Sequence, residues 1–446
     1  MNEKVTLKDI AGYEQEKEEA IKIIDILKKF EEYKEKGVYI PKGLILSGVP
    51  GVGKTLFAKA IANEASVPLY EFENSESEDE IVTIKNLKEI FDLAKKNSPS
   101  IVFIDELDEL VSSGDFVSDY SRKILKTLLT EIDGVNNSSG IMVIATTNYK
   151  ERLPKPLIRS GRMDKNLTIE IPDINSREKI LRLYLDKYSN LESIDSKLLA
   201  SKTNGLTGAD IKTLINETMI EVLSSKKEVV NTRDFENMIP QIIFKNIKKG
   251  QDEEVEEPIC YHELGHFICN YSLNNTIAEI SIEKYGEVGG FIMIPTDESE
   301  KVDCKSLGQL KNEIVISLAG IACQEVMLNE IYTGASSDIN RARICVGDII
   351  DSGMCGFECI VDSGPADKIV FERIKKTSSK KYMEKELEIL EESYEKAKAI
   401  INQNKQLVIY LLPHLKDKRK MSEKEIECLV EEYKEIIKKE ETVWKI

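Results

Sequence analysis

The stretch GLILSGVPGVGKT, residues 43–55, decides the fold of the first part of this chain. Its apolar first half predicts a buried strand, and TLFAKAIANEA (55–65) has the periodicity of a helix. Between them, residues 48–55 match the phosphate-loop pattern G-x-x-x-x-G-K-[S/T], whose backbone N–H groups close around phosphate oxygens at a helix start. Lys54 would reach the β and γ phosphates of ATP, and Thr55 would bind Mg²⁺. The predicted loop contacts are Gly48, Val49, Pro50, Gly51, Val52, Gly53, Lys54, Thr55 and Leu56.

Further buried runs extend this strand into a parallel α/β sheet flanked by helices. SIVFIDE (100–106) and GIMVIATTN (140–148) are short and β-branched, and an amphipathic helical stretch (119–135) lies between them. We therefore predict a nucleotide-binding domain over residues 1–150 and, from the helical pattern that follows, a helical lid over 151–245. A charged linker (246–258) leads to a mainly helical domain over 259–446, with a strand pair at 277–284 and 289–295.

Polar side chains end two of the predicted strands. Asp105 could hold Mg²⁺ directly or through water, and Glu106 is placed to orient or deprotonate the attacking water. Asn148 could contact the γ-phosphate or the water, although an asparagine at a strand end can also simply cap a turn. These three residues would complete an ATPase site.

Two arginines, Arg159 and Arg162, follow the Asn148 strand in LIRSGRMD. Surface arginines in such a loop are usually only solvated. In an ATPase they can instead reach the γ-phosphate of a neighbouring subunit and stabilise transition-state charge. That interpretation requires a ring of subunits.

Composition limits the function classes. A net charge of −17 over 446 residues argues against nucleic-acid binding through a general basic surface. No run of 18 apolar residues is present and the N-terminus is charged, so we expect no membrane span, no secretory signal and a cytoplasmic protein. The eight cysteines, including Cys355 and Cys359 in CGFEC, are expected to be thiols rather than disulfides or a metal pair.

A second chemical signal is YHELGHF, residues 261–267, in a chain with only three histidines. On a helix His262 and His266 share a face, and Glu263 lies beside the first, which is the H-E-x-x-H arrangement of zinc hydrolases. Zinc normally takes a third protein ligand. His414 lies in an apolar stretch and is better explained by packing. A carboxylate is expected instead, and Glu325, Asp338 and Glu283 remain open.

Together these motifs resemble the FtsH-type AAA metallopeptidases. The match runs from VTLKDIAG to about residue 432 and includes the phosphate loop, SIVFIDELDEL, IATTN, LIRSGRMDK, GLTGADI, YHELGHF and YTGASSDI. The resemblance implies zinc held by His262, His266 and Asp338, with Glu263 as catalytic base. It implies that Arg159 and Arg162 act on the adjacent subunit of a homo-hexamer. The adenine contacts it implies are Ile10, Ala11, Gly12, Gly208 and Ala209.

The chain departs from the family pattern in two places. The family carries an N-terminal membrane anchor, whereas this sequence begins directly at the ATPase motifs; from the initial methionine we expect a soluble relative rather than a trimmed sequence. The family's pore loop carries an aromatic residue and glycines, whereas ENSESEDEIVTIKNL (73–87) is acidic and about two residues shorter. Its acidic residues are Glu76, Glu78, Asp79 and Glu80. Its nearest apolar candidates for holding a polypeptide in the pore are Ile81 and Val82.

We expect an ATP-dependent zinc endopeptidase that translocates polypeptides through a ring and cleaves them processively. The strand GGFIMIP (289–295) could bind extended substrate by edge pairing, or could be a core strand. The acidic pore segment leaves two alternatives. One is an ATP-driven remodelling ring with a weak or regulatory peptidase, and the other is a peptidase with little ATP coupling.

Overall fold

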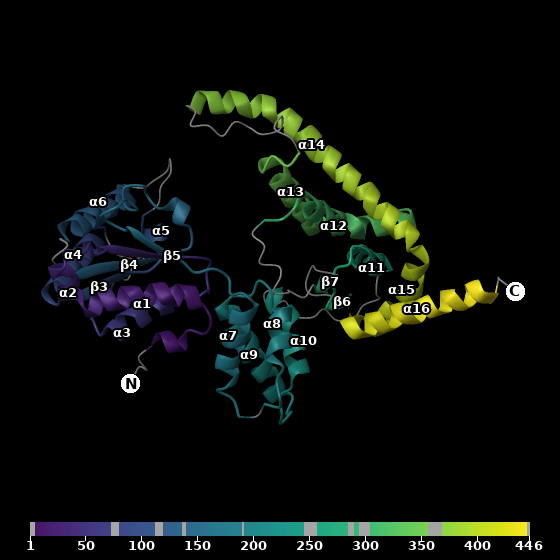
Figure 1. Cartoon of the computed structure of the whole chain (residues 1–446), viewed down its shortest axis with the longest axis horizontal. Coiled ribbons are helices and arrows are strands. Elements are labelled where there is room, and N and C mark those ends of the chain that lie inside the picture. Colours follow the sequence, from purple (N-terminus) through teal and green to yellow (C-terminus); the bar gives the residue numbers. More distant parts are fainter. Residues whose placement is uncertain are drawn as a thin grey trace. The chain divides into compact units, whose positions relative to one another are not determined.

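The computed structural model describes residues 5–72, 80–111, 119–135, 140–189, 191–244, 257–283, 290–293, 304–355 and 368–443. The chain divides into two units, Met1–Ile239 and Pro240–Ile446, and each is described by itself (Figure 1).

A five-stranded parallel sheet forms the centre of the first unit. Its strands are β1 (Gly43–Ser47), β2 (Leu69–Phe72), β3 (Ser100–Ile104), β4 (Ile141–Thr147) and β5 (Lys165–Thr168), in the order β2-β3-β4-β1-β5. β1, β3 and β4 are buried along their whole length, as expected of apolar runs in a parallel sheet. β5 was not apparent from the sequence, because only Leu167 of its four residues is buried.

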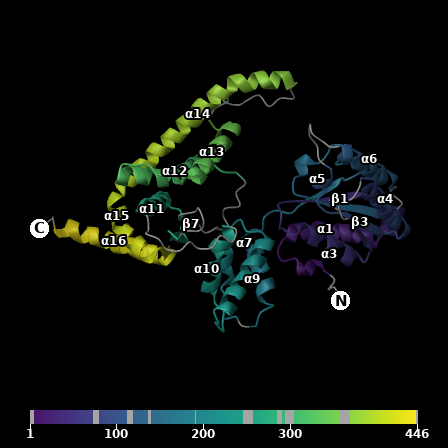
Figure 2. The same cartoon turned by 180° about the vertical axis from the view of Figure 1, so that it is seen from behind.

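Helices cover both faces of this sheet, which confirms the predicted fold class. α1 (Glu14–Lys28) and α3 (Lys54–Ala65) lie on one face, and α4 (Glu80–Lys96) and α6 (Asp119–Gly134) on the other (Figures 1 and 2). On the second face Phe91 and Leu128 pack into a buried cluster with Val102 and Val143. The shorter elements are η1 (Leu7–Asp9), α2 (Phe30–Glu35), α5 (Leu107–Leu110) and η2 (Lys150–Arg152).

The predicted helical lid follows the sheet. It consists of α7 (Ile174–Leu185), α8 (Ser196–Lys202), α9 (Gly208–Ser224) and α10 (Thr232–Ile243). Side-chain caps fix where these helices start: Asp173 accepts from Ser176 N at 2.7 Å, and Thr207 forms a capping box with Asp210. The second cap sets Gly208 in the first turn of α9.

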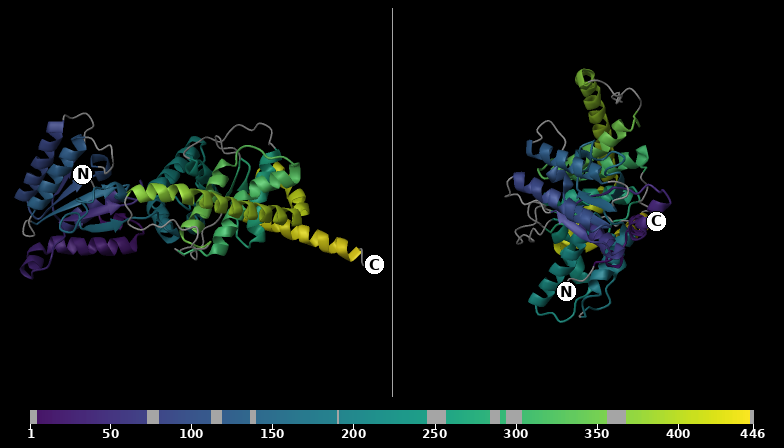
Figure 3. Two further views of the ribbon diagram at one scale, coloured as in Figure 1. Left: turned by 90° about the horizontal axis from the view of Figure 1, so that it is seen from above. Right: turned by 90° about the vertical axis from the view of Figure 1, so that its left-hand side faces the viewer.

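The second unit is mainly helical, as expected. Its helices are α11 (Glu257–Ser272), α12 (Leu307–Leu328), α13 (Ser336–Asp351), α14 (Lys368–Gln403), α15 (Lys405–Lys418) and α16 (Glu423–Val443). α14 is a single helix of 36 residues (Figure 3). An antiparallel sheet in the order β7-β6-β8 joins them, made of β6 (Glu279–Ser281), β7 (Phe291–Met293) and β8 (Lys420–Ser422).

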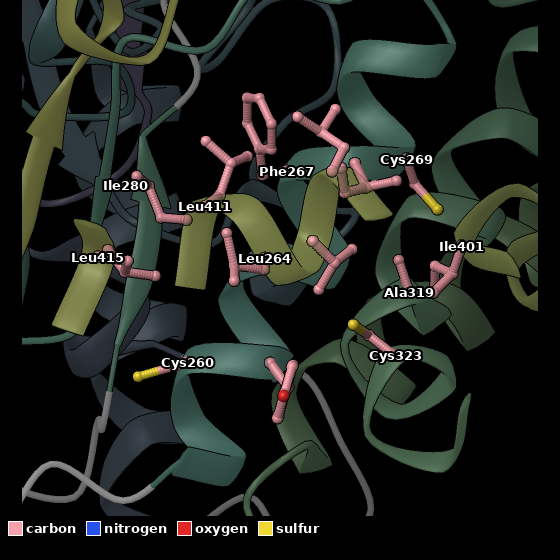
Figure 4. Close-up of a cluster of buried hydrophobic side chains, with 14 of the residues drawn as sticks. Cys260, Leu264, Phe267, Cys269, Ile280, Ala319, Cys323, Ile401, Leu411 and Leu415 are labelled. Atoms are coloured by element: carbon pink, nitrogen blue, oxygen red, sulfur yellow. The ribbon is translucent and has the colours of Figure 1, made fainter. Parts of the chain in front are cut away.

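The core of this unit surrounds α11. Leu264 and Phe267 of α11 meet Ile280 of β6, Ala319 of α12 and Leu411 of α15 in one buried cluster (Figure 4). α11 is therefore held by apolar contacts with several elements. This packing leaves His262 and His266 partly exposed.

Candidate functional site

The phosphate loop lies against the first turn of the lid helix α9. Gly51 has a φ of +84°, and a Cβ placed there would lie 2.7 Å from Thr207 Oγ1 and 3.0 Å from Ala209 Cβ. An L side chain would be strained and would collide with α9. The Gly51 carbonyl also accepts a hydrogen bond from Ala209 N at 3.0 Å. The loop and the lid are thus in direct contact.

Lys54 is the buried cation of this loop. Its Nζ donates to the carbonyls of Gly48 (2.8 Å) and Val49 (3.0 Å) and to Asn148 Oδ1 (2.8 Å). Burial lowers the pKa of the Lys54 ammonium, against the opposing effect of Asp105. Three uncharged oxygens therefore hold a cation for which phosphate oxygens would be stronger partners.

Asp105 and Glu106 lie at the carboxyl end of β3. Thr55 Oγ1 is 3.3 Å from Asp105 Oδ2, an oxygen pair of the kind that Mg²⁺ prefers. Thr146 fixes the neighbouring backbone, because its hydroxyl donates to Asp105 Oδ1 and accepts from Glu106 N at 2.9 Å. The charge of Glu109, then burial and Asp105, raise the pKa of Glu106.

A cavity of about 510 Å³ opens over this loop, a size that suits a nucleotide. The predicted residues that line it are Ile10, Ala11, Pro50, Gly51, Val52, Gly53, Lys54, Thr55, Leu56, Asp105, Glu106, Asn148, Gly208 and Ala209. Gly12, Gly48 and Val49 lie beside these residues in the chain but outside the lining. Lining residues that were not identified from the sequence are Asp9, Tyr13, Lys59, Thr146, Ile180, Leu183, Tyr184 and Lys212.

The two arginines lie outside this lining and differ in their surroundings. Arg162 donates from Nε and Nη2 to the two carboxylate oxygens of Asp133, both at 2.8 Å, and from Nη1 to the Pro156 carbonyl at 2.6 Å. Arg159 is exposed to solvent. Among the described residues, the guanidinium of Arg162 has partners in its own chain and that of Arg159 has none.

In the second unit, three ligand-type side chains converge. His262 Nε2 lies 3.1 Å from both His266 Nε2 and Asp338 Oδ2, and His266 Nε2 lies 3.6 Å from Asp338 Oδ2. A tetrahedral ion with bonds of about 2.0–2.1 Å holds its ligand atoms about 3.3 Å apart. Both the donor set and its spacing therefore fit a zinc ion.

The histidines are oriented from α12. His266 Nδ1 lies 2.8 Å from the Ile316 carbonyl, which assigns the ring proton to Nδ1 and leaves Nε2 as the ligand atom. Gly320 lies against His262, since a Cβ there would be 2.4 Å from Cε1 of that imidazole. Despite burial, the two imidazoles hold the pKa of Asp338 well below its usual range, and a carboxylate in this ionised state is a metal ligand.

Glu263 is buried beside these ligands, with 5% of its surface exposed. Burial raises the pKa of its carboxyl to about 7, a value suited to a general base. Gly290, the residue before β7, approaches so closely that a Cβ there would lie 2.7 Å from Glu263 Oε1. The start of the edge strand β7 therefore lies directly over this carboxylate.

Of the three carboxylates left open by the sequence, Asp338 joins the histidines. Glu325 instead accepts a hydrogen bond from Tyr394 and lies 3.5 Å from Lys398 Nζ. Glu283 follows β6, and it is not part of the metal-binding group found among the described residues. His414 packs with its ring centroid 5.3 Å from that of Tyr410, which agrees with its interpretation as a packing residue.

Three family models match successive parts of the chain. Residues 44–171 match the ATPase family associated with various cellular activities (AAA), 193–237 the AAA+ lid domain, and 249–429 peptidase family M41. The chain is 33% identical, over 96% of its length, to ATP-dependent zinc metalloprotease FtsH 2 of Petrotoga mobilis, of which the match covers 71%. It is equally similar to FtsH of Caldicellulosiruptor bescii, of which the match covers 73%. The chain belongs to the FtsH family. It is an ATP-dependent zinc metalloprotease with ATPase activity, and its cofactors are Zn²⁺, ATP and Mg²⁺.

Among the described residues, no helix is long and apolar enough to cross a membrane. The acidic segment lies mostly outside the described ranges, which leave out Glu76, Glu78 and Asp79 and the side chains of Glu80 and Ile81. Cys359, in another part of the chain, also lies outside the described ranges. Val82, on α4, is described and is 40% exposed.

Proposed function

We propose that this FtsH-family chain forms a hexameric ring that drives polypeptide to its zinc site with ATP and cleaves it there processively. The supporting observation is that one chain carries both a cavity over the phosphate loop and a His-His-Asp group with a buried glutamate beside it. The ring is supported by Arg159, which is exposed and lies outside its own nucleotide cavity. From there Arg159 would act on the γ-phosphate bound by the neighbouring subunit.

In the ATPase part, the loop N–H groups and Lys54 bind the phosphates, while Thr55 and Asp105 hold Mg²⁺. Glu106 orients or deprotonates the attacking water. Asn148, whose Oδ1 accepts a hydrogen bond from Lys54 Nζ, contacts the γ-phosphate or that water. The adenine lies between the N-terminal segment and the lid. Its contacts are Ile10, Ala11, Gly208 and Ala209, which line the cavity, together with the neighbouring Gly12.

In the peptidase part, His262, His266 and Asp338 hold zinc, which when bound polarises the peptide carbonyl and makes water a better nucleophile. Glu263 takes the proton of the attacking water and passes it to the leaving amine. Among the described strands β7 lies at the edge of its sheet, beside Glu263, so an extended substrate can add to the sheet there by edge pairing. This pairing would bring successive peptide bonds to the base.

We place this activity in the cytoplasm, where ATP is available. The seven cysteines among the described residues are free thiols, which suits a reducing compartment.

The test is degradation of casein, an unfolded protein, with and without ATP, by wild type, Glu263→Gln and Glu106→Gln. The proposal expects cleavage only with ATP and only when both glutamates are present. Cleavage that needs Glu263 alone would show a peptidase with little ATP coupling. ATP hydrolysis and zinc binding without any cleavage would favour a remodelling ring.

A further inference from the structure

The two faces of the short strand β7 meet different parts of the second unit. In the pairing with β6, Ile292 lies opposite Ile280, and Phe291 lies opposite Ser281. Because successive residues of a strand point to opposite faces, the side chains of Phe291 and Ile292 lie on opposite sides of the sheet. Ile280 lies in the core around α11 and Ile292 packs against that core. Phe291 therefore points away from it.

Phe244 packs against Phe291 on this second face. It directly follows α10, and its N–H donates to the Pro240 carbonyl at 2.9 Å, which continues the hydrogen bonding of the helix. The centroids of the two rings lie 5.4 Å apart and their planes are tilted by 58°, as in favourable aromatic pairs. Both residues belong to the second unit. The turn that ends α10 thus holds the outer side of β7.

The position of β7 matters because its first residue follows Gly290, which lies over the carboxylate of Glu263. A Cβ on Gly290 would be only 2.7 Å from Glu263 Oε1. β7 has three residues, and a strand pair this short is marginal by itself. The ring contact on Phe291 therefore fixes the end of β7 that lies beside the proposed base.

We propose that Phe244 is a positioning residue of the peptidase, which through Phe291 holds β7 where an extended substrate adds to the sheet. Phe244 supplies no metal ligand and acts only through its ring. A substrate that pairs with an already ordered strand does not have to provide the free energy of ordering it, so it binds more tightly. This inference rests on the proposed function, in which substrate pairs with β7.

The experiment measures kcat and KM for casein with ATP on the full chain, together with zinc affinity, ATP hydrolysis and thermal unfolding. The variants are Phe244→Leu, Phe291→Leu and the two together, because leucine keeps apolar bulk but removes the aromatic pair. Phe244→Tyr keeps the ring. Ile243→Ala is the matched control, because Ile243 is the last residue of α10, next to Phe244, and is 38% exposed.

Phe244→Leu should raise KM for casein by about 3–10-fold, the equivalent of one favourable aromatic pair. Its kcat and zinc affinity should stay near the wild-type values, because Glu263 and the metal ligands lie on α11 and α13 rather than on β7. Phe244→Tyr and Ile243→Ala should keep the wild-type KM. The double variant should have the same KM as Phe244→Leu, because both substitutions remove one shared contact.

Two results would overturn the inference. A wild-type KM in Phe244→Leu, even with a lower unfolding temperature, would show that the ring pair only stabilises the fold. A double variant whose rise in KM is the product of the two single rises would show that the two rings act independently. Cleavage of casein by wild type without ATP would instead refute the proposed coupling to ATP hydrolysis. The KM values would then be compared without ATP, so the two failures can be told apart.

Discussion

Replacing Gly320 by alanine should disable the metal site, although its helix, α12, supplies no metal ligand. The new Cβ would lie 2.4 Å from Cε1 and 2.5 Å from Nδ1 of the His262 ring, where ordinary contact begins at 3.4 Å. The imidazole or α12 would have to move by about 1 Å, whereas metal–ligand distances tolerate about 0.2 Å. Disturbing a neighbour that orients a ligand typically costs 10–100-fold in metal affinity. We therefore expect a loss of about 100-fold in zinc affinity.

The control for this variant is Gly308→Ala on the same helix. There the nearest atom to the new Cβ is Ser306 Oγ at 3.9 Å, so alanine meets open space and should stabilise the helix by up to about 1 kcal/mol. Zinc affinity is measured by competition with a chromogenic chelator, alongside casein cleavage and ATP hydrolysis. Gly320→Ala should lose zinc binding and cleavage but keep ATPase activity. Wild-type zinc affinity in Gly320→Ala would refute the argument from close packing.

Three further predictions test the two sites separately. Gly51→Ala should raise KM for ATP by about tenfold or more, because its Cβ would collide with Thr207 and its backbone conformation disfavours L residues. Zinc affinity should not change. An unchanged KM would contradict the contact between loop and lid. Chelation of zinc should abolish casein cleavage, reversibly on adding zinc back, without abolishing ATP hydrolysis; cleavage that persists in fully metal-free protein would rule out the metal mechanism. In metal-free protein the pKa of Glu263 is raised to about 7, so the folded state binds an extra proton between about pH 4.5 and 7 and stability falls as pH rises through that window. Relative to Glu263→Gln, the free energy of unfolding should drop by about 3 kcal/mol across that range. Urea denaturation at several pH values measures this, and parallel pH dependences for the two proteins would contradict the buried carboxyl.

Much of the nucleotide site could be predicted because its residues are local in sequence. The loop from Gly48 to Thr55 lies between a strand and a helix whose apolar periods are clear, and Asp105 and Asn148 directly follow buried strands. Parallel strands bring their carboxyl ends to one edge, so these side chains must meet. The lid side of the cavity was only partly predicted. Ile180, Leu183 and Tyr184 share one face of α7, but that spacing equally describes an ordinary buried helix face.

The peptidase site shows where sequence reasoning stops. The two histidines and Glu263 share one helix, so their proximity follows from helical geometry. Asp338 lies on a different helix, α13, and residue spacing could not distinguish it from Glu325 or Glu283. Gly320 and the Ile316 carbonyl carry no chemical signal in the sequence, because their roles depend on how closely α12 packs against α11.

The same limit applies to β5 and to the Asp133–Arg162 pair. The sequence KNLT has one buried residue and no alternation long enough to predict a strand, and its place in the sheet comes from pairing with β1. Asp133 is one of many acidic residues on amphipathic helices. Only the fold shows that it receives two hydrogen bonds from Arg162.

The most direct test of the central claim is casein degradation by oligomers assembled from a mixture of Glu106→Gln and Glu263→Gln chains. The first variant keeps the peptidase base and the second keeps the ATPase glutamate. If ATP hydrolysis in one subunit drives polypeptide to the zinc site of another, mixed oligomers should degrade casein with ATP well above the sum of the two separate variants. Activity equal to that sum, in oligomers shown to contain both chains, would contradict the account.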